Sequence, residues 1–209
     1  INNANQMIVN IDKAAGPQED RDNIKGQALA LRAYSYFNLI NFFQQTYKGN
    51  ESKPGVPLYL EPTMEGKPRG TVQQVYDQIV ADLTEAETLL SGKTRRHISN
   101  INVNVAQGIR ARVALQMEDY ATAAAYANKA RQGYSLMSRA QYTQGFSSKS
   151  NPEWMWGMEV NTEQATIYAS FFSHIDETTG GYAALGTQKK ITKALYDQIP
   201  EGDVRKEVF

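Results

Sequence analysis

A helical spacing pattern occurs twice in this chain, and it limits the possible fold more than any other feature. In each copy, a tyrosine is followed by apolar residues three, seven and ten positions later. The copies are Tyr76, Ile79, Leu83, Ala86 and Tyr120, Ala123, Ala127, Ala130. This spacing places each set on one stripe of an α-helix. A second helical segment precedes each stripe, and Leu31-Arg32-Ala33 in the first parallels Ile109-Arg110-Ala111 in the second. The sequence therefore predicts two pairs of helices.

These pairs resemble the helix hairpins of tetratricopeptide repeats. Small residues on one helix allow a partner helix to approach closely, and an aromatic residue near the turn closes the pair. Four residues of the second pair fall at the offsets of that repeat: Ala111, Tyr120, Ala123 and Ala130. We predict helices at residues 19–45, 71–91, 103–117 and 119–132, paired as two antiparallel hairpins.

Several residues mark the ends of these helices. Thr71 is a predicted N-cap, and Gln74 three residues later completes a capping box. Asn102 or Asn104 is expected to cap the third helix, and Asp119 the fourth.

The other segments are less regular. A modest helix is expected at residues 1–15, and residues 46–70, which hold four prolines, are expected to form a long irregular loop. Alternation at Trp154, Trp156, Met158 and Val160 predicts a short strand. A polar and aromatic loop follows, and then a last helix at residues 187–198. The predicted fold class is mainly α: tetratricopeptide-like helix hairpins with long irregular loops and one or two short strands.

Composition excludes several functions. Lys plus Arg and Asp plus Glu number 22 each, so no net charge attracts nucleic acid or an anionic membrane surface. Cysteine is absent, which excludes disulfides and thiolate chemistry. No apolar run reaches the roughly 20 residues of a transmembrane helix.

The sequence has no recognisable catalytic or metal-binding motif. The two histidines, His97 and His174, do not lie in a metal-ligand spacing. No nucleophile elbow or dinucleotide fingerprint is present. The carboxylates Asp82 and Glu85 lie three apart on a helix, which is typical of a solvated face or a cap partner. We therefore expect no enzyme activity, no cofactor and no metal ion.

Five segments together resemble the SusD/RagB family of outer-membrane nutrient-binding lipoproteins. They are Leu31-Arg32-Ala33-Tyr34-Ser35-Tyr36-Phe37-Asn38-Leu39, Gly55-Val56-Pro57-Leu58, Thr71 to Leu83 with Glu85-Ala86, Ala111-Arg112-Val113-Ala114-Leu115 with Asp119-Tyr120, and Asn151-Pro152-Glu153-Trp154-Met155-Trp156. Since proteins of that family are much longer, we expect residues 1–209 to be one fragment of such a protein. Its expected parts are a helical core at 1–133 and a strand, loop and final helix at 134–209.

The resemblance implies a surface-exposed lipoprotein of the outer membrane, held there by a lipid anchor. It implies a lid on a SusC-like, TonB-dependent transporter, and such a lid holds oligosaccharides, or peptides in some members, before import. An alternative function from another class is a tetratricopeptide-type scaffold that binds a peptide or a partner protein in its helical groove. A hydrolase is a third possibility, and it requires a pair of carboxylates lining a cleft.

The strongest ligand-binding candidates are rings in the polar loop between residues 162 and 186. They are Tyr168, Phe171, Phe172, His174 and Tyr182. Carbohydrate sites combine stacking rings with amide and hydroxyl groups, and this loop holds both; the alternative is that the rings fix the loop onto the helices. A second candidate is the loop between Tyr47 and Tyr59, with Tyr47, Asn50 and Tyr59 as its possible contacts.

Three other features favour structural interpretations. Arg32 and Arg110 lie among apolar residues, so each is expected to reach a carboxylate or helix-end carbonyls inside the stack. Trp154 and Trp156 can form a sugar platform, but two tryptophans on one strand face are more often core. The basic segment Lys93-Thr94-Arg95-Arg96 is interpreted as a solvated turn.

Overall fold

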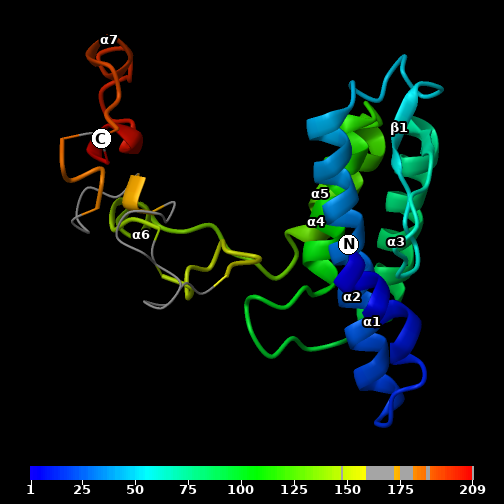
Figure 1. Ribbon diagram of the computed structural model, residues 1–209. Helices are drawn as coiled ribbons and strands as arrows, with labels where there is room; N and C mark the ends of the chain where they lie inside the picture. The colour runs from blue at the N-terminus through cyan, green and yellow to red at the C-terminus, as the bar shows by residue number, and fades with distance from the viewer. Residues whose placement is uncertain (147, 159–171, 175–180, 187–188, 209) are drawn as a thin grey trace. The chain divides into compact units, whose positions relative to one another are not determined.

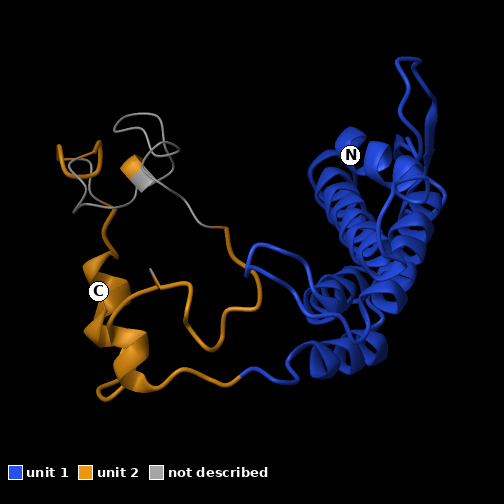
Figure 2. Ribbon diagram, turned by 90° about the horizontal axis from the view of Figure 1, so that it is seen from below, with its two compact units in different colours: residues 1–134 blue, residues 135–209 orange. Residues whose placement is uncertain are grey.

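The structure is a computed structural model that describes residues 1–146, 148–158, 172–174, 181–186 and 189–208. The chain forms two compact units, Ile1–Tyr134 and Ser135–Phe209 (Figure 2). Unit 1 is helical with one small sheet, and unit 2 contains only short helices among its described residues. Within these described ranges, no helix combines the length and the apolar character needed to cross a membrane.

Unit 1 is built from five helices (Figure 1). They are α1 (Asn2–Ile11), α2 (Gln18–Phe43), α3 (Val72–Leu90), α4 (Val103–Gln116) and α5 (Tyr120–Ala130). α2 packs along α3, α4 packs along α5, and α1 lies against α2. Figure 1 shows the helices of each pair side by side. The two predicted hairpins are therefore confirmed.

Contacts between the helices of each pair show that they run antiparallel. In the first pair, Gly26 near the start of α2 meets Leu90 at the end of α3, and a Cβ on Gly26 would lie 2.8 Å from the Leu90 side chain. At the other end of that pair, the Phe37 ring lies 6.5 Å from the Tyr76 ring. In the second pair, Asn104 at the start of α4 donates to the Ala130 carbonyl at the end of α5, at 3.0 Å.

The predicted caps are present. The Thr71 hydroxyl accepts from the backbone N–H of Gln74, and the Gln74 side chain accepts from the backbone N–H of Thr71, as a capping box requires. Of the two candidates for α4, Asn102 is the cap, since its side chain accepts from Val105 N–H at 3.0 Å. Asp119 caps α5 by accepting from Thr122 N–H at 3.1 Å. Each cap satisfies a donor that the first helical turn leaves unpaired.

The two predicted stripes differ in burial. All four residues of the α3 stripe are buried in the core. On α5, Ala123 and Ala130 are buried, but Ala127 is exposed and Tyr120 is 64% exposed. The reason is that α3 packs against both α2 and α4, whereas α5 packs mainly against α4. Spacing thus predicted the helical stripe, while the number of neighbouring helices decided how much of it is covered.

One carboxylate joins the two hairpins. Glu87 on α3 accepts hydrogen bonds from Gln107 on α4 at 2.8 Å and from Tyr126 and Lys129 on α5, at 3.2 Å and 3.3 Å. Burial alone raises the pKa of Glu87, but these hydrogen bonds and the Lys129 charge outweigh it and hold the pKa below its usual value.

The loop at residues 46–70 is more regular than expected. It contains β1 (Pro54–Pro57) and β2 (Arg69–Thr71), which pair antiparallel with Pro54 opposite Thr71 and Pro57 opposite Arg69. Gly55 permits this pairing, because a Cβ at that position would lie 2.9 Å from the Thr71 carbonyl oxygen. The two short strands therefore lie in a segment that we expected to be irregular, because its prolines interrupt the alternation typical of a strand.

Unit 2 corrects two expectations. Residues 154–158 form no strand, and Val160, the last residue of the predicted alternation, lies outside the described residues. The backbone turns at Asn151, whose carbonyl accepts from Trp154 N–H at 3.1 Å. Trp154 and Trp156 are both half-buried. The predicted final helix shortens to α7 (Lys193–Tyr196), and residues 187–188 lie outside the described ranges. The other elements are α6 (Arg139–Thr143), η1 (Phe172–His174) and η2 (Val204–Glu207).

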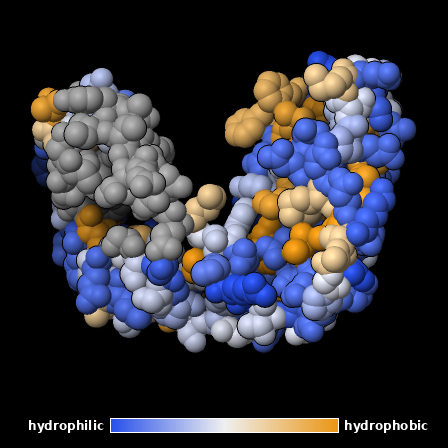
Figure 3. All heavy atoms as spheres, turned by 60° about the horizontal axis from the view of Figure 1, so that its bottom comes forward, coloured by the Kyte–Doolittle hydropathy of each residue, from blue (hydrophilic) through white to orange (hydrophobic). Residues whose placement is uncertain are grey.

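The face of unit 1 that Figure 3 shows is mainly hydrophilic, with hydrophobic residues gathered in a few places. The most exposed aromatic residues of this unit are Phe42 and Phe43 in the last turn of α2, at 80% and 69% exposure.

The close α4–α5 contact makes a prediction about stability. Ala123→Leu and Ala130→Leu should each lower the free energy of unfolding by about 1–3 kcal/mol, because a larger side chain does not fit between closely packed helices. Ala127→Leu is the matched control, since Ala127 is exposed on the same helix. Urea denaturation of the three variants measures the difference. Equal stability in all three would contradict close packing at this crossing.

Candidate functional site

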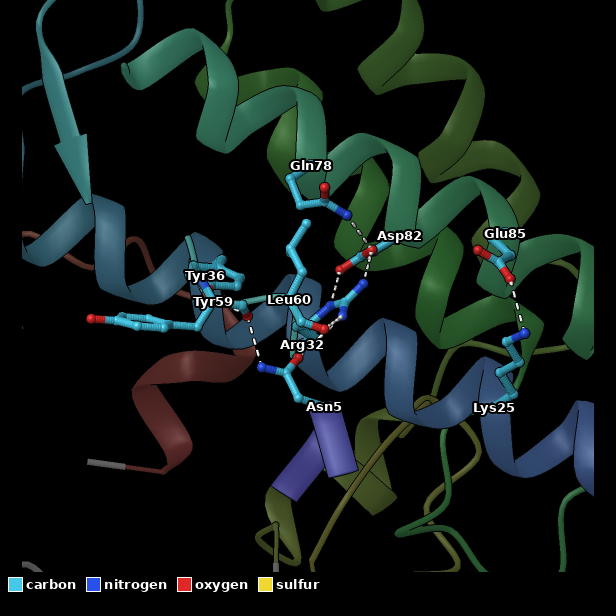
Figure 4. Close-up of polar contacts among 9 residues, drawn as sticks. All are labelled: Asn5, Lys25, Arg32, Tyr36, Tyr59, Leu60, Gln78, Asp82 and Glu85. Carbon is cyan, nitrogen blue, oxygen red and sulfur yellow. Dashed lines mark hydrogen bonds and ion pairs between the residues drawn. The ribbon is translucent and has the colours of Figure 1, made fainter. Parts of the chain in front are cut away.

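A buried ion pair lies at the centre of unit 1 (Figure 4). Arg32 on α2 donates two hydrogen bonds to the Asp82 carboxylate on α3, from Nε and from Nη2, both at 2.7 Å. The two residues are only 5% and 2% exposed. This two-point geometry matches the planar guanidinium to the planar carboxylate. The expectation that Arg32 reaches a carboxylate is confirmed. The expectation that Asp82 lies on a solvated face or acts as a cap partner is wrong, because a buried arginine pairs with it.

The pair also gathers neighbouring polar groups. Arg32 Nη1 donates to Asn5 Oδ1 on α1 at 3.1 Å and to the Leu60 carbonyl at 3.2 Å. Gln78 donates to Asp82 Oδ1 at 2.7 Å. Burying charge is costly unless its hydrogen-bonding capacity is used. Here the charges bind α1, α2, α3 and the segment around Leu60 together.

The backbone of Tyr59 is fixed by the same region (Figure 4). Its carbonyl accepts from Asn5 Nδ2 at 2.7 Å and from the Tyr36 hydroxyl at 2.9 Å. Its N–H donates back to the Tyr36 oxygen at 2.6 Å. Burial raises the pKa of Tyr36, so the phenol stays a neutral donor. The loop after β1 is thereby held against the helices.

The second candidate loop consists largely of such structural contacts. The Tyr47 hydroxyl donates to Gln73 at 2.6 Å, and its ring lies 4.9 Å from the buried Tyr76 ring. Asn50 donates to the Thr46 carbonyl at 2.8 Å. The Tyr59 hydroxyl accepts from Lys67 N–H at 3.1 Å. These bonds hold the loop in place, and a ligand contact by Tyr47, Asn50 or Tyr59 stays a prediction.

Arg110 does not repeat the pairing of Arg32. Its guanidinium carbon lies 5.5 Å from the centre of the Tyr126 ring, in a cation–π arrangement. Its Nε and Nη1 are buried and have no hydrogen-bond partner in the described parts of the chain. The expected carboxylate or helix-end carbonyl is therefore not found, and Arg110 rests on an aromatic ring instead.

The first candidate loop is described at two of its segments. Tyr168 and Phe171 lie outside the described residues, and Phe172 begins the 3₁₀ turn η1. His174 and Tyr182 come together as a stacked ring pair, with centroids 5.1 Å apart and planes 21° from parallel. His174 is exposed and Tyr182 is 41% exposed. Two of the five predicted residues therefore form an aromatic surface.

A small contact that the sequence did not reveal positions this ring pair. Ser173 is 3% exposed, and its carbonyl accepts from Ala183 N–H at 2.9 Å. Its hydroxyl accepts from Tyr182 N–H at 3.2 Å. Gly181 permits the approach, because a Cβ there would lie 2.5 Å from Ser173 Oγ. Ser173 thus fixes the backbone beside both rings. Among the described residues, no group of three or more His, Cys, Asp or Glu side chains could hold a metal ion.

These features define a helix-hairpin protein with a loop-borne aromatic surface, and comparisons with known proteins identify its family. The model of the family described as starch-binding and associating with the outer membrane, a SusD-like family, matches residues 1–115. This match covers more than half of the chain. The chain therefore belongs to the SusD-like family. No curated protein matches it.

Solved structures agree with this assignment. A SusD-like carbohydrate binding protein from Bacteroides vulgatus ATCC 8482 is 35% identical over 78% of this chain and 35% of its own, with a TM-score of 0.72. A SusD superfamily protein from Bacteroides thetaiotaomicron VPI-5482 is 27% identical over 77% of this chain and 37% of its own, with a TM-score of 0.70. A laminarin binding SusD-like protein is similar in fold, at 23% identity over 71% of this chain and 33% of its own, with a TM-score of 0.59. The chain spans about a third of the length of these structures.

The buried ion pair predicts a large effect of breaking it. Arg32→Met should lower the free energy of unfolding by about 3–5 kcal/mol, because Asp82 is then left buried without a partner. Replacing both residues, as Arg32→Met with Asp82→Leu, should restore part of that loss. Lys25→Met is the control: Lys25 pairs with the exposed Asp12 at 2.9 Å, and such surface pairs contribute about 0–1 kcal/mol. Urea denaturation decides the matter, and equal losses for Arg32→Met and Lys25→Met would contradict a central role for the pair.

Proposed function

We propose that this protein binds an oligosaccharide at the cell surface without converting it, and delivers it to a SusC-like, TonB-dependent transporter of the outer membrane. Membership of a family described as starch-binding and associating with the outer membrane supports the ligand class and the location. A structure that shares 35% identity with the chain is named a carbohydrate binding protein. The transporter and a lipid anchor are further parts of this proposal, and they come from the resemblance to the family.

The observation that carries the proposal is the stacked pair His174 and Tyr182. A pyranose ring has an apolar face of C–H groups, and an exposed aromatic ring is a suitable surface for it. Such a contact contributes about 0.5–1.5 kcal/mol beyond the buried area. Holding Tyr182 against His174 in advance also lowers the ordering cost of binding. Tyr168, Phe171 and Phe172 belong to the same proposed surface by sequence.

Weak binding suits a protein that passes its ligand on. Sugar hydroxyls exchange hydrogen bonds with water for hydrogen bonds with protein, so each bond adds little net free energy. Most of the selectivity then depends on ring contacts and on the placement of amide and hydroxyl groups. A protein of this kind needs no carboxylate pair for acid–base chemistry. The buried carboxylate Asp82 is already held by Arg32.

Titration calorimetry tests the proposed site. The full-length protein is first screened against a panel of neutral glycans that includes maltoheptaose, and the tightest binder is used as the probe. Tyr182→Ala and His174→Ala should each weaken binding about tenfold, because each removes part of the stacking surface. Their melting temperatures should stay nearly unchanged. Tyr168→Ala and Phe172→Ala extend the test to other rings of the loop.

Tyr120→Ala is the matched control. Tyr120 is 64% exposed, but it lies on α5 and not in the proposed surface. It should leave glycan affinity unaltered. Absence of binding to every neutral glycan of the panel would refute the proposed stacking site, and absence of binding to acidic glycans as well would refute the proposed function. Unaltered affinity in the loop variants would show that the glycan binds elsewhere. Tyr47, Asn50 and Tyr59 would then be the next residues to substitute. A variant that unfolds instead of losing affinity would show that the rings are structural.

A further inference from the structure

A polar pocket of about 290 Å³ lies in unit 1 between α2 and the basic turn at residues 93–100. From α2 it is lined by Asp20, Asn23, Ile24 and Gln27. The turn contributes Arg95, Arg96 and Asn100. This volume lies at the lower end of the roughly 300–1,000 Å³ typical of small-molecule sites, so the pocket suits one sugar unit and not a long segment.

The lining residues of the pocket are brought together by their spacing on α2 and by contacts that hold the turn in place. The four α2 residues are spaced i, i+3, i+4, i+7, so they share one face of the helix. Lys93 lies 3.7 Å from Glu19, next to that face. Within the turn, His97 N–H donates to Asn100 Oδ1 at 3.1 Å, and Asn100 N–H donates to the His97 carbonyl at 3.0 Å. The basic segment, which we interpreted as a solvated turn, therefore also contributes Arg95 and Arg96 to the lining of a pocket.

The wall carries hydrogen-bonding groups with capacity left for a ligand. Gln27 Nε2 donates to Asn23 Oδ1 at 3.0 Å, which orients both amides. Within the described ranges, the remaining amide groups of these residues, Asn23 Nδ2 and Gln27 Oε1, make no hydrogen bond. The same holds for Asn100 Nδ2. Two donors and one acceptor on a concave surface match sugar hydroxyls, which both donate and accept.

The charge of the pocket selects the kind of sugar. Its lining holds two arginines and one aspartate, a net charge of +1. Arg96 is 84% exposed at its side chain, and its Nη2 lies 4.0 Å from the Asp20 carboxylate, too far for a hydrogen bond. A guanidinium favours a carboxylate partner that can accept two parallel bonds. Arg95 already donates to the Ile98 carbonyl at 3.4 Å, so Arg96 is the charged group offered to a ligand. We propose that this pocket binds an acidic sugar unit, a uronic acid residue of a polysaccharide, with Arg96 facing its carboxylate and the amides facing its hydroxyls. This inference rests on the proposed carbohydrate-binding function and names a ligand class for it.

A pair of matched probes tests the charge preference. Methyl β-D-glucuronide and methyl β-D-glucoside differ only in the carboxylate at C6. Both are titrated into the full-length protein and followed by NMR through the side-chain NH₂ signals of Asn23, Gln27 and Asn100. The glucuronide should shift these signals with at least about tenfold higher affinity than the glucoside, as expected for hydrogen bonds to a charged group. Raising the salt concentration should reduce this difference, because Arg96 is exposed.

Substitutions then assign the effect to the pocket. Arg96→Gln should make the two probes bind equally. Arg112→Gln is the matched control, because Arg112 is an exposed arginine of α4 outside the pocket, and it should change nothing. Equal binding of the two probes to the unsubstituted protein would overturn the proposal. So would acetate that shifts the same signals as effectively as the glucuronide, since the sugar ring would then be irrelevant.

The experiments distinguish a failure of the proposal for this pocket from a failure of the proposed function. The Arg96→Gln protein should bind the neutral glycan selected from the panel as well as the unsubstituted protein does. If neutral glycans bind and the glucuronide does not, the proposal for this pocket is wrong and the proposed function stands. If no carbohydrate binds at all, both are wrong.

Discussion

The first hairpin depends on one buried, hydrogen-bonded ion pair between Arg32 and Asp82. A charge in a helical core is costly unless its hydrogen-bonding groups have partners. Here the guanidinium and carboxylate form two bonds with each other, and Asn5, Gln78 and the Leu60 carbonyl add three more. The arrangement also fixes the loop at residues 46–70, which is rich in proline and forms few backbone hydrogen bonds of its own. Fixing this loop at residues 59 and 60 gives it a defined path over the helices, and the β1–β2 pairing follows from that path.

Much of unit 1 could be predicted from the sequence because its determinants are local. A repeat of 3.6 residues and a capping side chain act within one or two turns, so the α3 stripe and the Thr71, Asn102 and Asp119 caps were visible in the chain itself. What failed depends on partners distant in sequence. Alternation at residues 154–158 satisfies the pattern of a strand, but a strand also needs a neighbour to pair with. Arg32 and Arg110 occupy equivalent positions, yet among the described residues Arg32 pairs with a carboxylate and Arg110 lies against the Tyr126 ring.

The candidate site shows the same division. Ring density in a polar loop pointed to His174 and Tyr182, and their stacking agrees with the composition. Ser173 and Gly181 gave no signal, because a serine hydroxyl and a missing Cβ acquire meaning only when two segments meet. The described part of the chain thus places aromatic rings on a loop of unit 2, and amide and guanidinium groups beside α2 in unit 1.

The carboxylate of Glu87 has a consequence for acid sensitivity. Its pKa is lower in the folded protein than in the unfolded chain, so the stabilisation it gives is complete above the unfolded value and disappears as the pH falls through the folded value. Protonation removes the acceptor that Lys129 and Tyr126 on α5 share with Gln107 on α4. The joint between the hairpins therefore weakens in strong acid, because the hydrogen bonds that tie α3 to α4 and α5 at this point all end on one carboxylate.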